Sequence, residues 1–481
     1  MINRNMELDI SQLEQSHDTN AMSRNIHKIY LIVAVVLGLF SSVVNPIFNE
    51  PDSPYHFEAS ANLVGLVVDI SRYGSTSVTT SLTGQSQSYV DGTHFEKYYL
   101  NEAYITEAKN FPREIGGNIL DYAQLGHIIP AIGIWIGYHI YPSIGVMVVF
   151  GRLLSSLVYS LLIYFIIKRL KKGKLTFTAL MLSPVIVSQF SSFSYDALSY
   201  VLVAASVAVA INVVDDNKLS PKNILEMLIV SFLILVAAKL NFKTIIIIYP
   251  LIVVAIWFNK HVHKKGKYSP ISSKSSTFSY DRRRKKRNHN LNLMKIGALL
   301  AAVLAFIVAA IVILQRYGGI FYVLRRLVVN LVSNVAPPMF TSLFVSPYRT
   351  NSIPIWVTVS WCVLLILCLL AEEKFVKSKL ISFGALSLLI LNILAVYFQY
   401  MISGYYDTGT TAANQLVGAI SGVQGRYFTP LFLLLVLFSG STYFKAKIKE
   451  TRVIVALVIS LAVLSNIILI VNNFWGVILA L

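Results

Sequence analysis

The sequence is poor in charged residues and in cysteine, and both shortages narrow the class of protein. Only 13% of the 481 residues are charged, whereas 55% are hydrophobic, and the mean hydropathy is +0.64. Soluble globular domains carry roughly 25% charged residues, so this composition excludes a soluble fold. Cys362 and Cys368 lie in one apolar run, which excludes a disulfide framework and a Cys-x-x-Cys metal or redox site.

Several enzyme motifs are missing as well. The sequence has no Gly-rich nucleotide loop, Walker motif, HExxH or GxSxG in a suitable context. It therefore predicts neither nucleotide-sugar use nor hydrolase chemistry. No cofactor is expected, and although a divalent metal is left open, no metal-ligand pattern supports one.

Long apolar runs are the main feature that is present. About 20 apolar residues cross the hydrocarbon core, and roughly eleven such runs predict an all-α, polytopic transmembrane protein, within a range of about 10–13 spans. The first 28 residues are polar and lack an A-x-A site, so we expect the first run to remain as an anchor. The expected spans are 29–45, 144–167, 175–190, 197–214, 224–240, 243–258, 293–315, 354–371, 380–400, 427–444 and 453–472.

The net charge is +18, and the basic residues that cause it are concentrated in particular loops. One cluster is Lys168–Lys174, and another is the insert Asn259–Asn290, which contains the run Arg282–Arg287. The positive-inside rule places both in the cytoplasm. Binding of anionic headgroups or RNA is an alternative, but the insert is typical of a solvated loop, and no nucleic-acid partner is predicted. The protein is thus expected in the cell membrane with its N-terminus inside.

This topology divides the chain into four parts. Residues 1–28 form a cytoplasmic tail, and 29–258 a membrane core with a long external loop, 46–142. Residues 259–292 form a basic cytoplasmic loop, and 293–481 carry the last helices, with external loops 316–353 and 401–426.

Three segments within these parts carry expectations of their own. In loop 46–142, Tyr55–Tyr73 has helical spacing and Ala123–Tyr141 is expected to lie as a helix in the outer interface, since counting it as a span would move the Lys168 cluster outside. The amphipathic stretch Ile320–Val332 is expected to be anchored to headgroups by Arg316, Arg325 and Arg326. Arg152, two turns inside its span, should have a partner.

The most informative stretch is Asn45–Glu58, which follows the first span. Three prolines stiffen the backbone around Asp52, as expected for a carboxylate held in a fixed place. Other unusual polar groups also fall on the external side: Asp196, Lys239, Lys243 and Arg426. This placement favours an enzyme or receptor that works at the outer leaflet.

Three motifs resemble a known family. They are Pro-Asp-x-Pro-x-His-Phe after the first span, Ser194-Tyr195-Asp196 at the head of a later span, and Gln424-Gly425-Arg426-Tyr427-Phe428-Thr429-Pro430 near the C-terminus. Together they resemble the bacterial membrane family called domain of unknown function 2142, over nearly the whole chain. That family resembles a branch of the GT-C glycosyltransferases, which use polyprenyl-phosphate sugar donors and place the catalytic acid in the first external loop. The family usually reads Pro-Asp-Glu, whereas this chain has Ser53 at the Glu position.

The resemblance implies a glycosyltransferase with a polyprenyl-phosphate-linked donor and a glycan or lipid-linked acceptor. Such a reaction needs a base for the acceptor hydroxyl, and Asp52 is the candidate. A turn or helix-capping Asp is the alternative reading. His56, one turn on, is expected to orient that carboxylate or bind a sugar hydroxyl, unless it is merely interfacial.

The departing phosphate needs cationic or hydrogen-bonding ligands. Arg426 is the leading candidate, because a guanidinium can bind phosphate through two prongs. Lys239 and Lys243 are further candidates, and membrane anchoring explains these two lysines equally well. For Arg426, anchoring at the start of a span is the less favoured alternative. The remaining substrate-binding candidates are Glu50, Asp196, Gln424 and Tyr427, with helix capping the alternative for Asp196 and solvation for Glu50.

Two other functions remain open. A flippase or transporter for lipid-linked sugars would show mid-membrane polar residues and Gly- or Pro-broken helices in paired halves. A non-catalytic subunit of envelope polysaccharide assembly is the second alternative, because Ser53 replaces the family carboxylate.

Overall fold

The computed structural model describes fifteen stretches of the chain. They are residues 25–48, 50, 52–70, 95–103, 105–107, 122–265, 304, 308, 311–315, 318–332, 339–347, 353–402, 423–446, 448 and 450–475. The chain forms two compact units: Met1–Ile256 with Pro338–Ala395 and Gln424–Leu481, and Trp257–Pro337 with Val396–Val423. Most of the predicted span 293–315 and of the loops 74–92, 259–290 and 403–422 lies outside the described residues.

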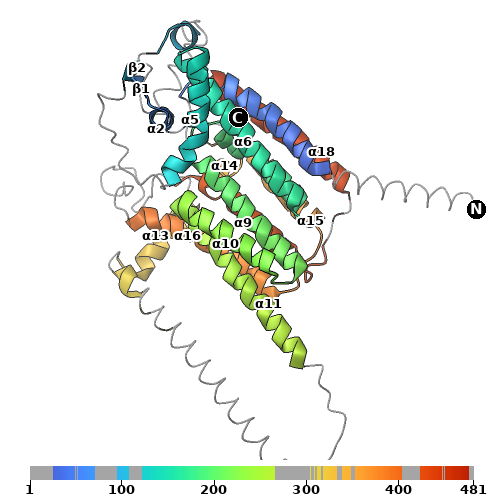
Figure 1. The fold of residues 1–481 in the computed structure, drawn as a ribbon. Helices are drawn as coiled ribbons and strands as arrows, with labels where there is room; N and C mark the ends of the chain where they lie inside the picture. The colour runs from blue at the N-terminus through green and yellow to red at the C-terminus, as the bar shows by residue number, and fades with distance from the viewer. Residues whose placement is uncertain are drawn as a thin grey trace, which may run out of the picture. The chain divides into compact units, whose positions relative to one another are not determined.

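The first unit is almost entirely helical (Figure 1). Its main helices are Asn25–Val44, α2 (Ser53–Leu63), α5 (Tyr122–Ile140), α6 (Ile144–Arg169), α7 (Lys174–Met181), α8 (Pro184–Phe190), α9 (Asp196–Asp216), α10 (Pro221–Ala237), α11 (Ile248–Lys265), α14 (Met339–Ser342), α15 (Ile355–Ala371), α16 (Lys379–Ile402), α17 (Leu435–Ser439) and α18 (Thr451–Trp475), of which α11 and α16 run on into the second unit. Short 3₁₀ segments are η4 (Leu240–Ile247), η5 (Gly425–Tyr427) and η6 (Thr429–Leu434), and η2 (Glu96–Leu100) is a π-helix. The second unit contains α13 (Ile320–Val332), which has the bounds predicted for the amphipathic stretch.

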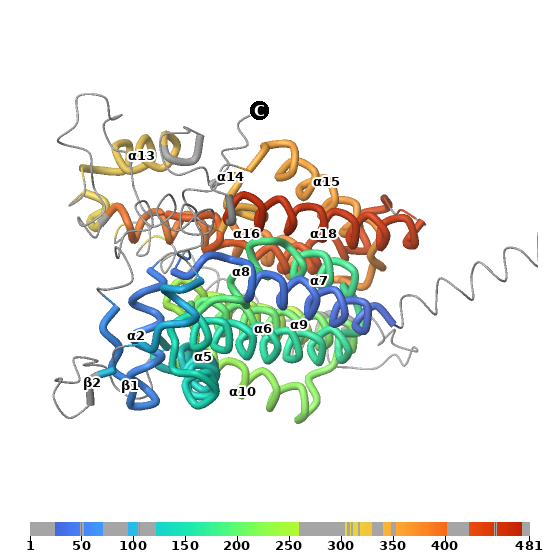
Figure 2. The backbone as a smooth tube through the Cα atoms, turned by 90° about the horizontal axis from the view of Figure 1, so that it is seen from above, coloured from blue at the N-terminus to red at the C-terminus, as the bar shows by residue number. Residues whose placement is uncertain are grey.

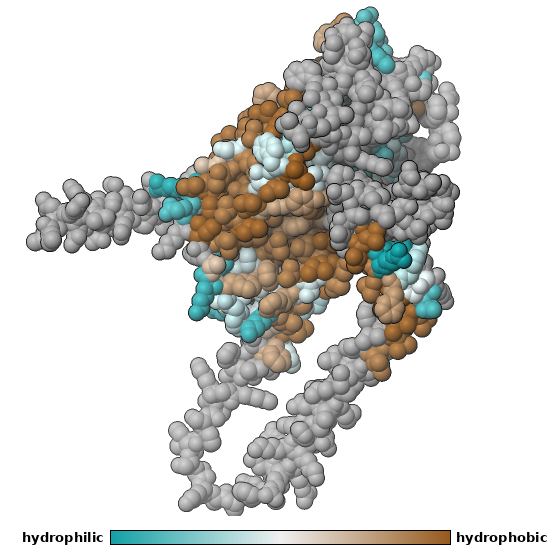
Figure 3. All heavy atoms as spheres, turned by 180° about the vertical axis from the view of Figure 1, so that it is seen from behind, coloured by the Kyte–Doolittle hydropathy of each residue, from teal (hydrophilic) through white to brown (hydrophobic). Residues whose placement is uncertain are grey.

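Six helices of the described chain are long and apolar enough to cross a membrane. They are Asn25–Val44, Ile144–Arg169, Asp196–Asp216, Leu240–Phe258, Lys379–Met401 and Thr451–Asn473. Shorter apolar helices are Ile355–Ala371 and Thr429–Ser439. Apolar side chains gather into a broad face over the helices in Figure 3, as expected for a surface against lipid. A polytopic helical membrane protein is confirmed, whereas the predicted count of about eleven spans is not established.

Two predicted spans are not continuous helices in the structure. The span 175–190 is divided into α7 and α8, because Ser183 before Pro184 adopts an extended conformation. The span 427–444 consists of the 3₁₀ segment η6 and the short α17, which ends at Ser439. Pro430 stands in the first turn of η6.

The predicted helix over Tyr55–Tyr73 ends early, at Leu63. Gly65 then has φ of +80°, a left-handed conformation that suits glycine, and the chain turns into the strand β1 (Leu66–Val68). This strand pairs antiparallel with β2 (Ile105–Glu107). The small sheet lies beside α2 (Figure 2), so one short β element is added to the predicted all-α fold.

Close helix packing holds α5 against α6. A Cβ atom on Gly133 would come within 2.5 Å of the Phe150 carbonyl oxygen, and one on Gly137 within 2.9 Å of the Met147 Cα. Small residues of this kind let helix backbones approach each other in membrane proteins. The helix α5 is 19 residues long but is not among the six candidate spans, and whether it lies in the interface stays a prediction.

The helix α9 is buried along most of its length, beside α6 and α10. Its 21 residues extend roughly 30 Å, about the thickness of a hydrocarbon core. Asp216 at its C-terminal end forms an ion pair with Lys171, while Asp196 at its start pairs with Lys239. The helix thus separates two polar ends of the unit.

The end near Asp216 is held together by a half-buried carboxylate, that of Glu372. Glu372 accepts hydrogen bonds from the backbone N–H groups of Gly173, Leu175 and Thr176, at 3.0, 2.9 and 3.1 Å. These N–H groups start α7 and lack partners within the helix, so the carboxylate caps it from another segment. Segments predicted on the cytoplasmic side, 168–174, 215–223 and 372–379, therefore meet at one end.

Candidate functional site

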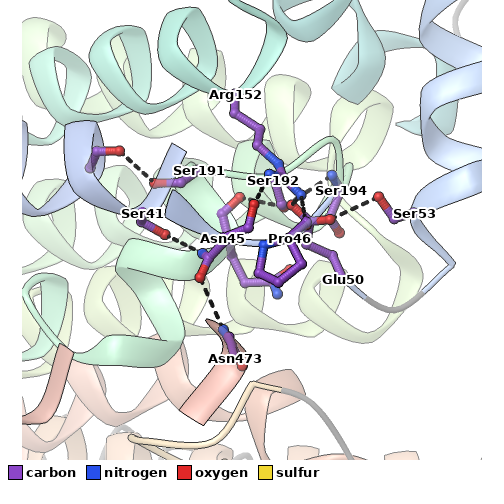
Figure 4. A network of polar contacts seen from close by, with 12 residues as sticks. Ser41, Asn45, Pro46, Glu50, Ser53, Arg152, Ser191, Ser192, Ser194 and Asn473 are labelled. Atoms are coloured by element: carbon purple, nitrogen blue, oxygen red, sulfur yellow. Dashed lines mark hydrogen bonds and ion pairs between the residues drawn. The ribbon is translucent and has the colours of Figure 1, made fainter. Parts of the chain in front are cut away.

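Arg152 holds the segment after the first helix in place. Its Nη1 donates to the Asn45 carbonyl at 2.9 Å, its Nη2 donates to the Pro46 carbonyl at 2.9 Å, and Nη2 lies 2.5 Å from Glu50 Oε1. Ser53 donates to the other Glu50 oxygen at 2.9 Å. Figure 4 shows Arg152 reaching from α6 to these groups. The prediction that Arg152 has a partner is confirmed, and because buried charges need such partners, this network fixes the start of the loop that carries Asp52.

The same network continues to the C-terminal helix. Asn45 donates to Ser41 Oγ at 2.8 Å, and Asn473 on α18 donates to Asn45 Oδ1 at 3.1 Å. Three helices far apart in the chain therefore converge on Asn45 (Figure 4). The carboxylate of Glu50 is engaged by Arg152 and Ser53, which suits a positioning role.

A second ion pair, between a partly buried lysine and a buried aspartate, stands at the start of α9. Lys239 Nζ donates to Asp196 Oδ1 at 3.1 Å, and the side chains are 20% and 2% exposed. Asp196 is the first residue of α9 and follows the N-cap Tyr195, so it is not the capping residue. Lys239 is fixed through its backbone N–H, which donates to Ser199 Oγ at 3.0 Å. Burial alone would lower the pKa of the Lys239 ammonium, but the Asp196 carboxylate raises it, so the group stays charged.

Arg426 brings a second cation to this ion pair. The residue lies in η5 and is 5% exposed, and its backbone carbonyl accepts a hydrogen bond of 2.8 Å from Tyr200 on α9. Gly425 N donates to Ser342 Oγ at 2.7 Å, which fixes η5 from the other side. Burial alone would lower the pKa of the Arg426 guanidinium, but Tyr427 and Asp196 raise it, so the group stays charged.

The two cations face one carboxylate. Within the described chain, no acid lies within 4.0 Å of the Arg426 guanidinium, and its Nε has no hydrogen-bond partner. The buried Gln424 Oε1 also lacks one. The Tyr427 side chain hydrogen-bonds this guanidinium, but no described carboxylate forms an ion pair with it. A buried cation without a counterion is costly, so the arrangement is suited to receiving an anion.

Aromatic rings surround the Lys239 ammonium. Its Nζ lies 4.3 Å from the ring centre of Tyr427 and 5.2 Å from that of Tyr195. Tyr122, at the start of α5, meets Tyr195 edge-on at 5.3 Å. Such faces hold cations and also stack on sugar rings.

His56 completes the cluster from α2. Its Nδ1 lies 2.9 Å from Nε2 of His127 on α5, and its ring centre lies 5.0 Å from that of Tyr195. Burial lowers the pKa of His56 to about 3, with His127 adding to the effect, and burial lowers the pKa of His127 to about 4. Both rings are therefore neutral at pH 7. We refer to His56, His127, Asp196, Lys239 and Arg426, with the tyrosines around them, as the polar site.

The structure thus brings together five of the predicted site residues: His56, Asp196, Lys239, Arg426 and Tyr427. Gln424 directly precedes η5. Lys243 is partly exposed in η4, and no contact places it with the others.

Asp52 lies apart from these contacts. It is exposed at the N-cap of α2 with φ of 55°, and its side chain makes no capping hydrogen bond. Among the described residues its carboxylate has no partner, and the His56 ring bonds His127 instead. The carboxylate is open to a ligand, and its catalytic role stays a prediction.

His127 was missed by the sequence analysis. The sequence predicts an interfacial helix at this place. The contact made by the neighbouring Gly126 explains why His127 reaches the site. A Cβ on Gly126 would lie 2.4 Å from the Tyr195 Cβ, so α5 and Tyr195 touch there. A histidine beside Gln124 and Gly126 in an apolar helix was the available signal.

The His and Asp side chains of the polar site do not form a metal centre in the part of the chain that the structure describes. No group of three or more His, Cys, Asp or Glu side chains lies close enough to hold an ion there.

The fold and this site define a polytopic helical membrane protein with a charged, aromatic-lined polar site at one end of its helices. The chain belongs to a family of predicted membrane proteins, domain of unknown function 2142, which matches residues 35–435. This confirms the family resemblance. No curated protein and no solved structure matches the chain.

Proposed function

We propose that the protein is a membrane glycosyltransferase that moves a sugar from a polyprenyl-phosphate donor to a cell-envelope glycan or lipid-linked acceptor. The reaction takes place at the outer side of the cell membrane. The observation that carries this proposal is the excess cation of the polar site: Lys239 and Arg426 face the single carboxylate of Asp196. A donor phosphate supplies the missing negative charge.

The residues divide into three roles. Arg426 and Lys239 hold the phosphate that leaves with the lipid, which stabilises charge on the leaving oxygen. Asp196 keeps Lys239 charged and oriented, and Gln424 and Tyr427 line the same place. Asp52 takes the proton of the acceptor hydroxyl, and Glu50 positions it by holding its loop on Arg152.

The catalytic base is tested with Asp52→Asn. The amide keeps the shape of the side chain but cannot accept the proton, so transfer from polyprenyl-phosphate sugars should fall by about 100- to 10,000-fold. Because Asp52 is exposed, the variant should insert and unfold like the parent. Near-normal turnover in Asp52→Asn would remove the residue from this role.

The phosphate site is tested with Arg426→Lys. A lysine keeps the charge but loses the two-pronged contact, so it should be nearly as inactive as Arg426→Ala. Lys243→Arg is the matched control, since this lysine lies outside the contacts of the site, and it should retain activity. Full activity in Arg426→Lys, with normal insertion, would contradict the phosphate role.

A flippase or transporter of lipid-linked sugars is the second candidate, and one observation favours it. Two apolar segments are not continuous α-helices: one is divided into α7 and α8, and the other consists of the 3₁₀ segment η6 followed by α17. The helix α7 contacts η6. Discontinuous helices line the substrate sites of many transporters. Reconstituted vesicles separate the two functions: a flippase moves the lipid across the bilayer without an acceptor, whereas a transferase consumes the donor only when the acceptor is present.

A further inference from the structure

The histidine pair of the polar site has a defined hydrogen-bond order. The Nε2 atom of His127 is directed at His56, and the ring also makes a hydrogen bond with the backbone of Ala123, one turn earlier in α5. Because Nε2 is already directed at His56, we assign the backbone contact to Nδ1. A backbone carbonyl can only accept, so Nδ1 of His127 carries the proton. Nε2 of His127 is then the acceptor, because a neutral imidazole has one protonated nitrogen.

The same reasoning extends to His56. Its Nδ1 must donate to Nε2 of His127, which leaves its own Nε2 without a proton. No hydrogen bond to this Nε2 is found within the described stretches. The series of hydrogen bonds from the Ala123 carbonyl through His127 to His56 therefore ends at one unoccupied acceptor atom, Nε2 of His56.

That acceptor lies in surroundings suited to a sugar ring. The His56 ring meets Tyr195 at 5.0 Å and Tyr55 at 5.3 Å, both edge-on. The Tyr195 ring lies in turn 5.2 Å from the Lys239 ammonium. Phosphate ligand, aromatic face and hydrogen-bond acceptor thus follow one another, in the order of the parts of a sugar phosphate.

We propose that Nε2 of His56 accepts a hydrogen bond from a hydroxyl group of the donor sugar, and that His127 is the positioning residue that fixes its tautomer. The proposal rests on the proposed function, because it takes the phosphate to lie on Lys239 and Arg426. It gives the site a ligand class, a pyranose 1-phosphate with a free hydroxyl group remote from the phosphate. It also gives His127 a role through His56 and not through the substrate.

The tautomer order is measured directly with ¹⁵N-histidine-labelled protein, with His56→Asn and His127→Asn used to assign the resonances. We expect a protonated Nδ1 and an unprotonated Nε2 on both residues. His127→Gln offers a carbonyl oxygen to His56 and should preserve the His56 pattern, whereas His127→Leu should lose it. A protonated Nε2 on His56 in the parent protein would overturn the proposal.

Ligand binding is measured on the same signal. Titration with a panel of hexose 1-phosphates should shift the unprotonated Nε2 resonance of His56, and inorganic phosphate should not. A response to inorganic phosphate alone, or to no hexose 1-phosphate, would overturn the sugar contact. Because this readout needs no turnover, a shift in a protein that transfers no sugar would disprove the transferase activity and leave the sugar site standing.

Kinetics give the matching test where transfer is detected. His127→Leu should raise KM about ten-fold with a smaller change in kcat, since one neutral hydrogen bond contributes about that factor. His127→Gln should restore most of the affinity. Equal losses in both variants, with normal thermal unfolding, would show that His127 does not act through its acceptor atom.

Discussion

At the residue scale, the two acids in and near the first loop have opposite surroundings. Glu50 is 3% exposed and is held by Arg152 and Ser53, whereas Asp52 is exposed and has no partner among the described residues. Removing one partner of a buried ion pair leaves an uncompensated charge and is strongly destabilising. Glu50 and Arg152 therefore contribute to folding, and Asp52 is the acid that remains available for chemistry.

The buried histidines predict how stability depends on pH. Burial lowers the pKa of His56 to about 3 and that of His127 to about 4, whereas an unfolded histidine has a pKa of about 6.5. The unfolded chain therefore binds more protons than the folded protein as the pH falls below about 6.5. The contribution of the two neutral histidines to stability is complete above about pH 6.5. It is lost as the pH falls toward their pKa values in the folded protein.

Lowering the pH from 7 to 5 should thus reduce the free energy of unfolding by about 2 kcal/mol for each histidine. Thermal unfolding in detergent measures this loss. His56→Asn with His127→Asn is the control, because it should remove most of the pH dependence in this range. An unchanged pH dependence in that double variant would show that other groups cause it.

At the scale of the elements, the contact between α5 and Tyr195 holds the polar site together. The place of a Cβ on Gly126 lies 2.4 Å from the Tyr195 Cβ and 2.6 Å from its Cα. Neither atom is the flexible end of a side chain, so an added methyl group must move α5 away. The adjacent His127 would then lose its alignment with His56.

Gly126→Ala is therefore expected to lower the free energy of unfolding by about 1–3 kcal/mol and to weaken the His56–His127 contact. Thermal unfolding and the ¹⁵N signals of the histidines report the two effects. Gly384→Ala is the control, because the nearest atoms there are the flexible ends of Leu251 at 2.8 Å. A Gly126→Ala protein with unchanged stability would contradict this packing.

At the scale of the whole molecule, polar groups are divided between two ends. Lys171 and Asp216 mark the end where the basic loop 168–174 meets Glu372, and Lys239 and Asp196 mark the other. The positive-inside rule predicts that the basic end faces the cytoplasm, and the polar site is then expected to face outside.

Tags test this assignment. A tag in Asn259–Asn290 should be reached only from the cytoplasm, and a tag in Gly74–Gly92 only from outside. Residues 74–92 and 266–290 lie beyond the described residues. Impermeant labelling of intact cells and of inverted vesicles provides the measurement. External labelling of Arg282–Arg287 would reverse the orientation and with it the side on which the site works.

The sequence by itself determined the class of protein and the identity of most site residues. Hydropathy is a local property, so apolar runs predict membrane helices, and α9, α15 and α18 lie within three residues of their predicted bounds. Because antiparallel spans return polar loops to the same end, the sequence alone predicts that Asp196, Lys239 and Arg426 lie on one side of the membrane.

Only the tertiary structure decided which polar groups become partners. His56 bonds a residue 71 positions away, and Tyr200 bonds the backbone of one 226 positions away. Such pairs depend on how helices pack, which no local pattern encodes. Packing also decided that Glu50 is committed to Arg152 and that the span 175–190 breaks before Pro184, since a buried backbone or charge takes whichever partner the neighbouring helices bring within reach.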